Sequence, residues 1–79
     1  MNITQEVIKK LIVDRLSLLK TININDKWSL HHKNYDFVEG FLYAESPESS
    51  YEEFVRDNET ELKKIYREAY EEAFNEVVK

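Results

Sequence analysis

The chain has no cysteine, one glycine and one proline among its 79 residues. The lack of cysteine excludes disulfides and thiol chemistry, and no glycine-rich phosphate loop or nucleophile elbow is present. No apolar run has the length that a bilayer crossing requires. Because Glu6, Lys9 and Lys10 interrupt the first apolar stretch, a signal peptide is not indicated. We therefore expect a cytoplasmic protein that does not contact a membrane.

The negative charge is concentrated in the C-terminal part of the chain. Residues 1–46 hold six acidic and six basic side chains, whereas residues 47–79 hold ten acidic and five basic ones, so the second segment accounts for the net charge of -5. A local negative field favours a basic protein surface as a partner and disfavours nucleic-acid phosphate. A solvated helix face explains the same run of charge without any partner.

Apolar residues near the N-terminus recur with the spacing of an amphipathic helix. This spacing predicts a helix over residues 3–20, with Asn2 as its N-cap. Arg15 lies near the centre of the apolar face and interrupts it. Either the Arg15 stem packs on the core with its charge at the rim, or the guanidinium pairs with a carboxylate of another helix or subunit. The residues of the face are Val7, Ile8, Leu11, Ile12, Leu16, Leu18 and Leu19.

The central segment is open to two interpretations. Its aromatic and β-branched residues favour strands, which predicts a β-hairpin at about residues 27–44. The doubled spacing of Phe37-Val38 and Phe41-Leu42 instead favours a short helix over residues 35–45. In that helix Gly40 would offer a smooth patch for another backbone, and the proline at position 47 would end it.

The last segment predicts a long helix with two start signals, Ser46 before Pro47 and Ser50 with Glu53 as a capping box. An unbroken helix over residues 48–78 would be roughly 45 Å long, more than a compact domain of this size accommodates. We favour a break or kink near residues 57–60, where Asn58 would cap a new helix instead of burying its amide. The alternative is an unbroken helix whose overhanging apolar stripe is covered by a second chain.

These patterns predict an all-α fold, a small bundle of three to four helices. The alternative is an α+β fold with the central hairpin. At this length the chain fits a single helical domain, residues 1–79, with little stability in reserve.

Residues that could support catalysis or metal binding lack a convincing arrangement. His31 and His32 are adjacent, so they point to different sides of a helix or a strand and make poor joint ligands. Glu68, Glu72 and Glu76 form a row at four-residue spacing, but the histidine that helical carboxylate sites require is missing. We therefore expect no cofactor, no metal and no enzymatic activity.

The sequence thus favours a role in binding other proteins. We expect a small acidic protein-binding module, an inhibitor or regulator of a host protein of the kind that phages and mobile elements encode. The alternative is a self-assembling structural or accessory homodimer without a separate target. Aromatic anchors would lie at one edge of the buried face of the last helix. Glu72 and Glu76 would lie at the other edge, in a position to pair with Arg15. The candidate partner-binding residues are Tyr66, Tyr70, Phe74, Glu72, Glu76 and Arg15.

Overall fold

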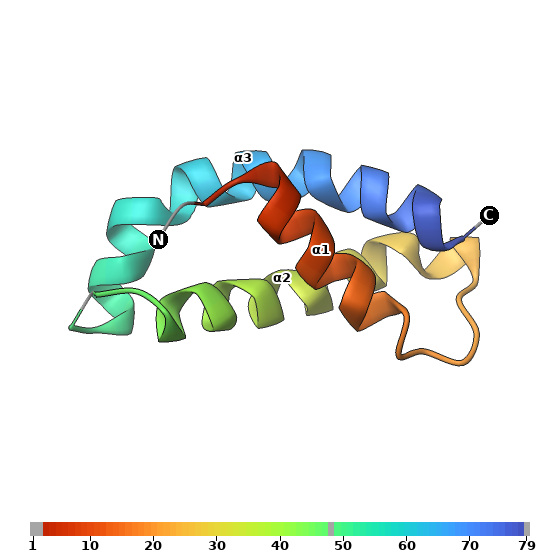
Figure 1. The fold of residues 1–79 in the computed structure, drawn as a ribbon, viewed down its shortest axis with the longest axis horizontal. Coiled ribbons are helices and arrows are strands. Elements are labelled where there is room, and N and C mark those ends of the chain that lie inside the picture. Colours follow the sequence, from red (N-terminus) through yellow and green to blue (C-terminus); the bar gives the residue numbers. More distant parts are fainter. Residues whose placement is uncertain (1–2, 48, 79) are drawn as a thin grey trace.

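The computed structural model describes residues 3–47 and 49–78 and is all-α, as predicted (Figure 1). It comprises α1 (Gln5–Leu16), a short 3-10 helix η1 (Ile24–Asp26), α2 (Lys27–Ala44) and α3 (Tyr51–Val77). No strand occurs among the described residues, and α2 occupies the segment for which a β-hairpin was the alternative.

The helices form an elongated bundle in which α1 lies across α2 and α3 (Figure 1). The principal extents are 39 × 17 × 17 Å, and the Cα radius of gyration is 12.7 Å. α1 packs mainly against α3, on which the small residues Ala69 and Ala73 are fully buried. α2 and α3 are held further apart by large side chains, including Tyr66 and Tyr70, whose hydroxyls reach the α2 backbone.

α1 is shorter than predicted at both ends. Its N-cap is Thr4, whose hydroxyl oxygen accepts a 3.3 Å hydrogen bond from the backbone N–H of Val7; the predicted cap, Asn2, lies outside the described residues. The helix ends at Leu16, and turn hydrogen bonds carry the chain onward, including one from the Leu19 N–H to the Leu16 carbonyl. Residues 17–20 therefore leave the helix, and Leu18 does not lie on its buried face.

α2 begins at Lys27, well before the predicted start at residue 35. The preceding η1 is capped by Asn23, whose side-chain oxygen accepts a hydrogen bond from the Asn25 N–H at 2.9 Å. At the other end, the Glu45 N–H still bonds to the Phe41 carbonyl before the chain reaches Pro47. The aromatic residues that favour strands are therefore carried by a helix, because one face of it is buried against α1 and α3.

α3 is a single helix, so the prediction of a break near residues 57–60 is wrong. Figure 1 shows that the ribbon changes direction in its teal-to-cyan first part without interruption, in line with the kink that was the other form of this prediction. The Asn58 amide is satisfied within the helix, because its Nδ2 donates to the Phe54 carbonyl at 3.0 Å. The elongated shape of the molecule accommodates the full length of the helix.

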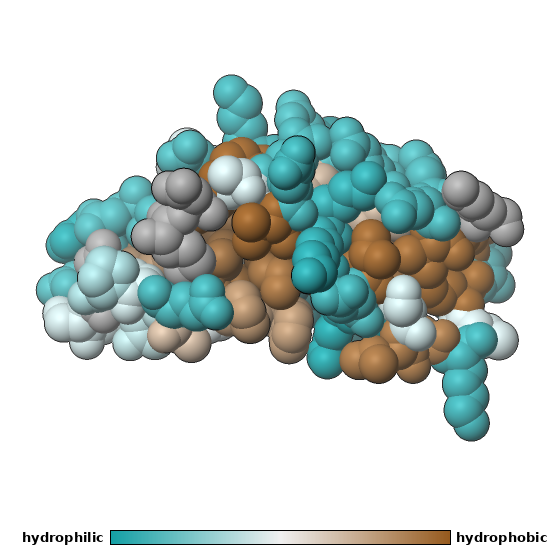
Figure 2. All heavy atoms as spheres, in the orientation of Figure 1, coloured by the Kyte–Doolittle hydropathy of each residue, from teal (hydrophilic) through white to brown (hydrophobic). Residues whose placement is uncertain are grey.

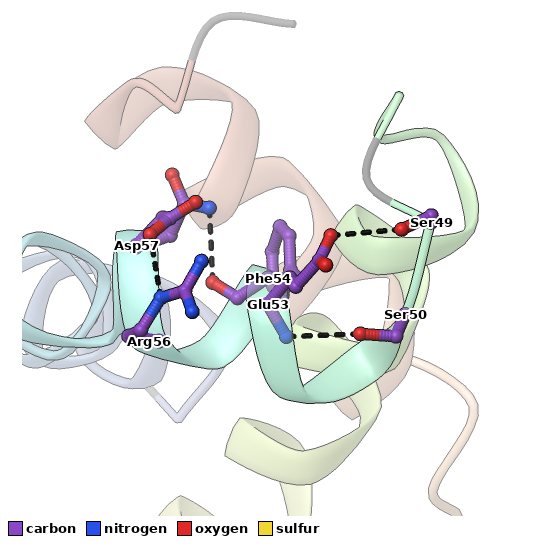
Figure 3. A network of polar contacts seen from close by, with 7 residues as sticks. Ser49, Ser50, Glu53, Phe54, Arg56 and Asp57 are labelled. Atoms are coloured by element: carbon purple, nitrogen blue, oxygen red, sulfur yellow. Dashed lines mark hydrogen bonds and ion pairs between the residues drawn. The ribbon is translucent and has the colours of Figure 1, made fainter.

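The start of α3 follows the second of the two predicted signals. The Ser50 hydroxyl oxygen accepts a hydrogen bond from the Glu53 N–H at 3.2 Å, and the Ser49 hydroxyl donates to the Glu53 carboxylate at 2.8 Å (Figure 3). The helix begins at Tyr51, so the prediction of a start at Pro47 is wrong. A serine that accepts from the third helical N–H satisfies one of the donors that a helix start leaves open.

Candidate protein-binding surface

The three predicted aromatic anchors lie in the core. Tyr66, Tyr70 and Phe74 are each at most 1% exposed, so the prediction that Tyr70 and Phe74 lie at the edge of the buried face is wrong. The Tyr66 hydroxyl donates to the His31 carbonyl at 2.7 Å, and the Tyr70 hydroxyl donates to the Lys27 carbonyl at 2.6 Å. Because α2 starts as early as Lys27, its first turns cover these three side chains. They are therefore not available for contact with a partner.

Burial also changes the acidity of these two phenols. It raises the pKa of Tyr70 to about 12, with a smaller contribution from the negative charge of Glu71. Burial likewise raises the pKa of Tyr66, further still. Both phenols are therefore neutral hydrogen-bond donors throughout the physiological pH range.

Glu72 and Glu76 form ion pairs within the chain, but not with Arg15 as predicted. The Lys9 ammonium lies 2.9 Å from Glu76 Oε2 and 3.8 Å from Glu72 Oε2. Gln5 Nε2 also donates to Glu72 Oε1 at 2.9 Å. The hydrogen bond and charge of Glu76 raise the pKa of Lys9. α1 presents Lys9, one turn further along than Gln5, to this edge of α3, so these contacts fasten α1 to α3.

Arg15 extends over α2 instead. Its guanidinium carbon lies 4.5 Å from the centroid of the Phe37 ring, a cation–π arrangement. Its side chain is exposed, so the charge stays in water while one face of Phe37 is covered. Of the two interpretations of Arg15, a pair with a carboxylate is not seen among the described residues.

Exposed apolar side chains lie at one end of the molecule, in the connection from α1 to α2. We name the apolar end as Leu18, Leu19, Ile24 and Trp28, which fall within eleven consecutive residues. Leu18 is 77% exposed, Ile24 is 68% and Trp28 is 57%. Figure 2 shows brown surface at the end of the molecule where Figure 1 places this connection. Exposed apolar clusters of this kind mark interaction sites more often than isolated side chains do.

A second exposed surface runs along α2. We name the α2 row as Lys33, Phe37, Phe41 and Glu45, which follow one another at four-residue spacing. Phe37 is 39% exposed and Phe41 is 38%, and both charged members are exposed. Neither Lys33 nor Glu45 forms an ion pair with any described residue. Gly40 lies beside the row, and a Cβ built on it would meet nothing within 4 Å.

A groove of about 430 Å³ lies between α2 and α3. The His31 ring stands edge-on to the rings of Tyr66 and Tyr70, with centroid distances of 4.9 and 4.7 Å. Both ring nitrogens of His31 are buried without a hydrogen-bond partner among the described residues. Burial and the neighbouring charge of His32 lower the pKa of His31, so its imidazole is neutral at pH 7. The groove is lined by His31, His32, Tyr35, Asp36, Lys63, Tyr66 and Arg67.

A buried carboxylate joins α2 to the start of α3. Glu39 is buried and accepts hydrogen bonds from two phenols, the Tyr35 hydroxyl at 2.8 Å and the Tyr51 hydroxyl. Burial first, and then the bond to Glu39, raise the pKa of Tyr35; the bond to Glu39 raises the pKa of Tyr51 to about 12. Glu39 therefore has hydrogen-bond donors that compensate for its removal from water, and we assign it a structural role.

Among residues 3–47 and 49–78, no group of three or more histidine, cysteine, aspartate or glutamate residues is placed to hold a metal ion. In the same residues, no helix is both long enough and apolar enough to pass through a bilayer. No protein-family model, curated protein or solved structure matches the chain.

The exposure of Phe37 and Phe41 on α2 is partly predictable from the sequence, through the doubled spacing that indicates one helical face. The doubled spacing puts Phe37 and Phe41 on one face together with Val38 and Leu42. Neighbouring helical positions lie about 100° apart, so a narrow contact buries only one member of each pair. Val38 and Leu42 are fully buried, and the two phenylalanines are left on the flank. Exposure of the apolar end has no comparable signal, because it depends on where α1 stops.

Proposed function

We propose that the chain is a small acidic protein-binding module that inhibits or regulates another protein by occupying part of its surface. The observation that carries the proposal is the apolar end, where Leu18, Leu19, Ile24 and Trp28 are exposed close together in the sequence. Water contact with this much apolar surface is unfavourable, and a partner that covers it gains that free energy on binding.

The composition of the apolar end suits it to be the centre of an interface. Trp28 offers a large ring, and tryptophan is enriched among the residues that dominate binding energy. The Lys27 ammonium lies 5.6 Å from the Trp28 ring centroid and 2.6 Å from Glu71 Oε2, which orders the side chain beside the ring. Leu18 projects from the turn after α1 with little intramolecular cover.

The charge of the module favours a partner with a basic surface. The net charge is -5, and Glu61 and Glu68 on α3 are exposed and form no ion pair with a described residue. A negative field accelerates encounter with a basic protein and repels nucleic acid. This role, like that of regulators from phages and mobile elements, is exercised in the cytoplasm and needs no cofactor.

Affinity capture from the native host tests the proposal. Wild-type protein is compared with the double variant Leu18→Ser/Trp28→Ala, at about 0.05 M and about 0.5 M salt, because exposed charges are screened at the higher concentration. We expect a basic protein that wild type retains at low salt, that high salt weakens, and that the double variant loses.

Val7→Ser provides the matched control, since Val7 is 42% exposed on α1 and is not part of the apolar end. It should retain the captured protein as wild type does. Equal capture by the double variant, or loss with both variants, would count against the apolar end as the contact. Capture that does not respond to salt would remove the basic-surfaced partner from the proposal.

A further inference from the structure

We infer that the α2 row is a self-association surface, on which a second copy of the chain docks antiparallel. The inference rests on the proposed role as a protein-binding module and names a second copy as one of its partners. It concerns Lys33, Phe37, Phe41 and Glu45, none of which belongs to the apolar end. The two surfaces adjoin, because Lys33 lines one hollow together with Leu18 and Leu19. They share no residue, so each can be substituted without changing a member of the other.

The four-residue spacing of the row matches the commonest way in which two helices pack. Side chains at this spacing form a ridge inclined by about 26° to the helix axis, and two such ridges become parallel when the helices cross at about 50°. The α2 row is one such ridge, and its two central members are the half-exposed Phe37 and Phe41. Two copies that cross at this angle would place the two rows alongside each other.

The order of residues in the row makes it complementary to itself. When a second row runs antiparallel about the midpoint at residue 39, Lys33 faces Glu45 of the second copy, and Phe37 faces Phe41 of the second copy. Symmetry repeats each contact, as in any twofold interface. A parallel arrangement would instead set lysine against lysine and glutamate against glutamate, which is repulsive. The charges therefore select the antiparallel orientation.

The groups that this contact needs remain accessible in the monomer, although Arg15 covers one face of the Phe37 ring. Lys33 and Glu45 have no ion-pair partner among the described residues. The Arg15 guanidinium lies over the Phe37 ring at 4.5 Å, yet the ring remains 39% exposed. Both charges and both rings are thus accessible to a second copy.

Gly40 gives an independent reason for a close approach. A glycine in the middle of a helix is unfavourable relative to alanine, and no described neighbour within the chain requires the absence of a Cβ here. Gly40 and Ala44 are both exposed and flank Phe41. This low relief beside Phe41 leaves room for the rings of the second row, so that the two helices can pack at an ordinary interaxial distance of about 8–10 Å.

The interface is small, so the dimer should be weak and reversible. Contacts below about 1,200 Å² of total buried surface are typical of transient complexes. We expect a dissociation constant of about 0.1 mM or tighter at low salt. Sedimentation equilibrium of the purified chain, from about 10 µM to about 1 mM, covers the range in which the monomer and the dimer would both be populated.

Charge reversal provides the decisive test. Lys33→Glu should weaken the dimer at least about tenfold, because the introduced carboxylate would face Glu45 of the second copy, and Glu45→Lys should do the same by setting lysine against lysine. The double variant Lys33→Glu/Glu45→Lys exchanges the two charges and should restore the dissociation constant to within about threefold of wild type. Circular dichroism of each variant checks that the monomer folds.

Phe41→Ser tests the apolar centre of the row and should weaken self-association, while Leu18→Ser at the apolar end should leave it unchanged. A wild-type chain that remains monomeric at about 1 mM would overturn the inference, as would a dimer indifferent to both charge reversals or a double variant as weak as the singles. The Lys33→Glu variant should still capture the partner proposed for the apolar end. Loss of dimerisation therefore tests this inference, and loss of capture tests the proposed function.

Discussion

The Tyr66 hydroxyl donates a 2.7 Å hydrogen bond to the His31 carbonyl, while the His31 ring stands edge-on to the Tyr66 ring at 4.9 Å between centroids. One tyrosine of α3 thus contacts both the backbone and the side chain of one residue of α2. Tyr70 repeats the relationship one turn further along α3, through the Lys27 carbonyl and an edge-on contact with the same His31 ring. These contacts fix how α2 lies along α3.

Replacing Tyr70 by phenylalanine removes the hydroxyl that reaches the Lys27 carbonyl at 2.6 Å. We expect Tyr70→Phe to lower the free energy of unfolding by about 1 kcal/mol, the usual net worth of one hydrogen bond. Urea denaturation measures the change. Tyr43→Phe is the matched control, because the Tyr43 hydroxyl makes no hydrogen bond with a described residue, and it should change the midpoint much less.

Acidification should destabilise the fold through His31. Burial first, and then the charge of His32 and of Arg67, lower the pKa of His31, while Glu71 acts in the opposite direction. The unfolded chain therefore takes up a proton at His31 before the folded chain does, so the free energy of unfolding falls as the pH drops through about 6.5.

His31→Phe removes this group and keeps an aromatic ring among the tyrosines. We expect the variant to lose less stability than wild type between about pH 7.5 and about pH 5.5, as measured by urea midpoints at several pH values. An identical slope for the two proteins over this window would show that His31 does not contribute to it.

Gly40→Ala should stabilise the monomer. The added methyl meets nothing within 4 Å, and alanine in a helix interior is more favourable than glycine by about 0.5–1 kcal/mol. Thermal or urea unfolding at low protein concentration, where self-association does not contribute, measures the gain. A loss of stability would indicate that α2 is distorted at this position.

Ser50→Ala should destabilise the start of α3. The Ser50 hydroxyl oxygen caps the Glu53 N–H at 3.2 Å, and loss of such a cap costs about 1 kcal/mol. Ser49→Ala is the comparison, since the Ser49 hydroxyl donates an exposed hydrogen bond to the Glu53 side chain and should contribute a few tenths of a kcal/mol at most. Equal effects of the two substitutions on the urea midpoint would argue against the assigned cap.

Local patterns in the sequence predict the buried face of α1 and the start of α3, but not the extent of α2. The three- and four-residue recurrence of apolar side chains correctly places Ile8, Ile12 and Leu16 on the buried face of α1. The N-cap at Ser50 is also confirmed, while the Glu53 carboxylate, the other half of the expected capping box, bonds to the Ser49 hydroxyl. Both depend on neighbours within one or two turns. The all-α class follows from such signals, because each is complete within a single helix.

The candidate binding surface cannot be predicted from local patterns, because the exposure of a side chain depends on contacts between helices. The sequence predicts Tyr70 and Phe74 at an edge, but a helix that starts at Lys27 covers them, and strand-favouring aromatic residues conceal that start. It also predicts that Glu76 reaches Arg15, but the crossing of α1 over α3 brings Lys9 to Glu76 instead. Neither the crossing nor the cover has a local signature in the sequence.

The slender shape, 39 by 17 by 17 Å, keeps the interior of the molecule close to its surface. Buried and exposed side chains are direct neighbours along its helices. Val38 is fully buried, for example, and the adjacent Phe37 is 39% exposed. A partner that binds the folded chain but not the unfolded chain raises the free energy of unfolding. At a partner concentration of about a hundred times the dissociation constant, the increase is about 2.7 kcal/mol. In so slight a domain that gain is a large fraction of the total, so a shift in melting temperature can identify a binding partner without any label.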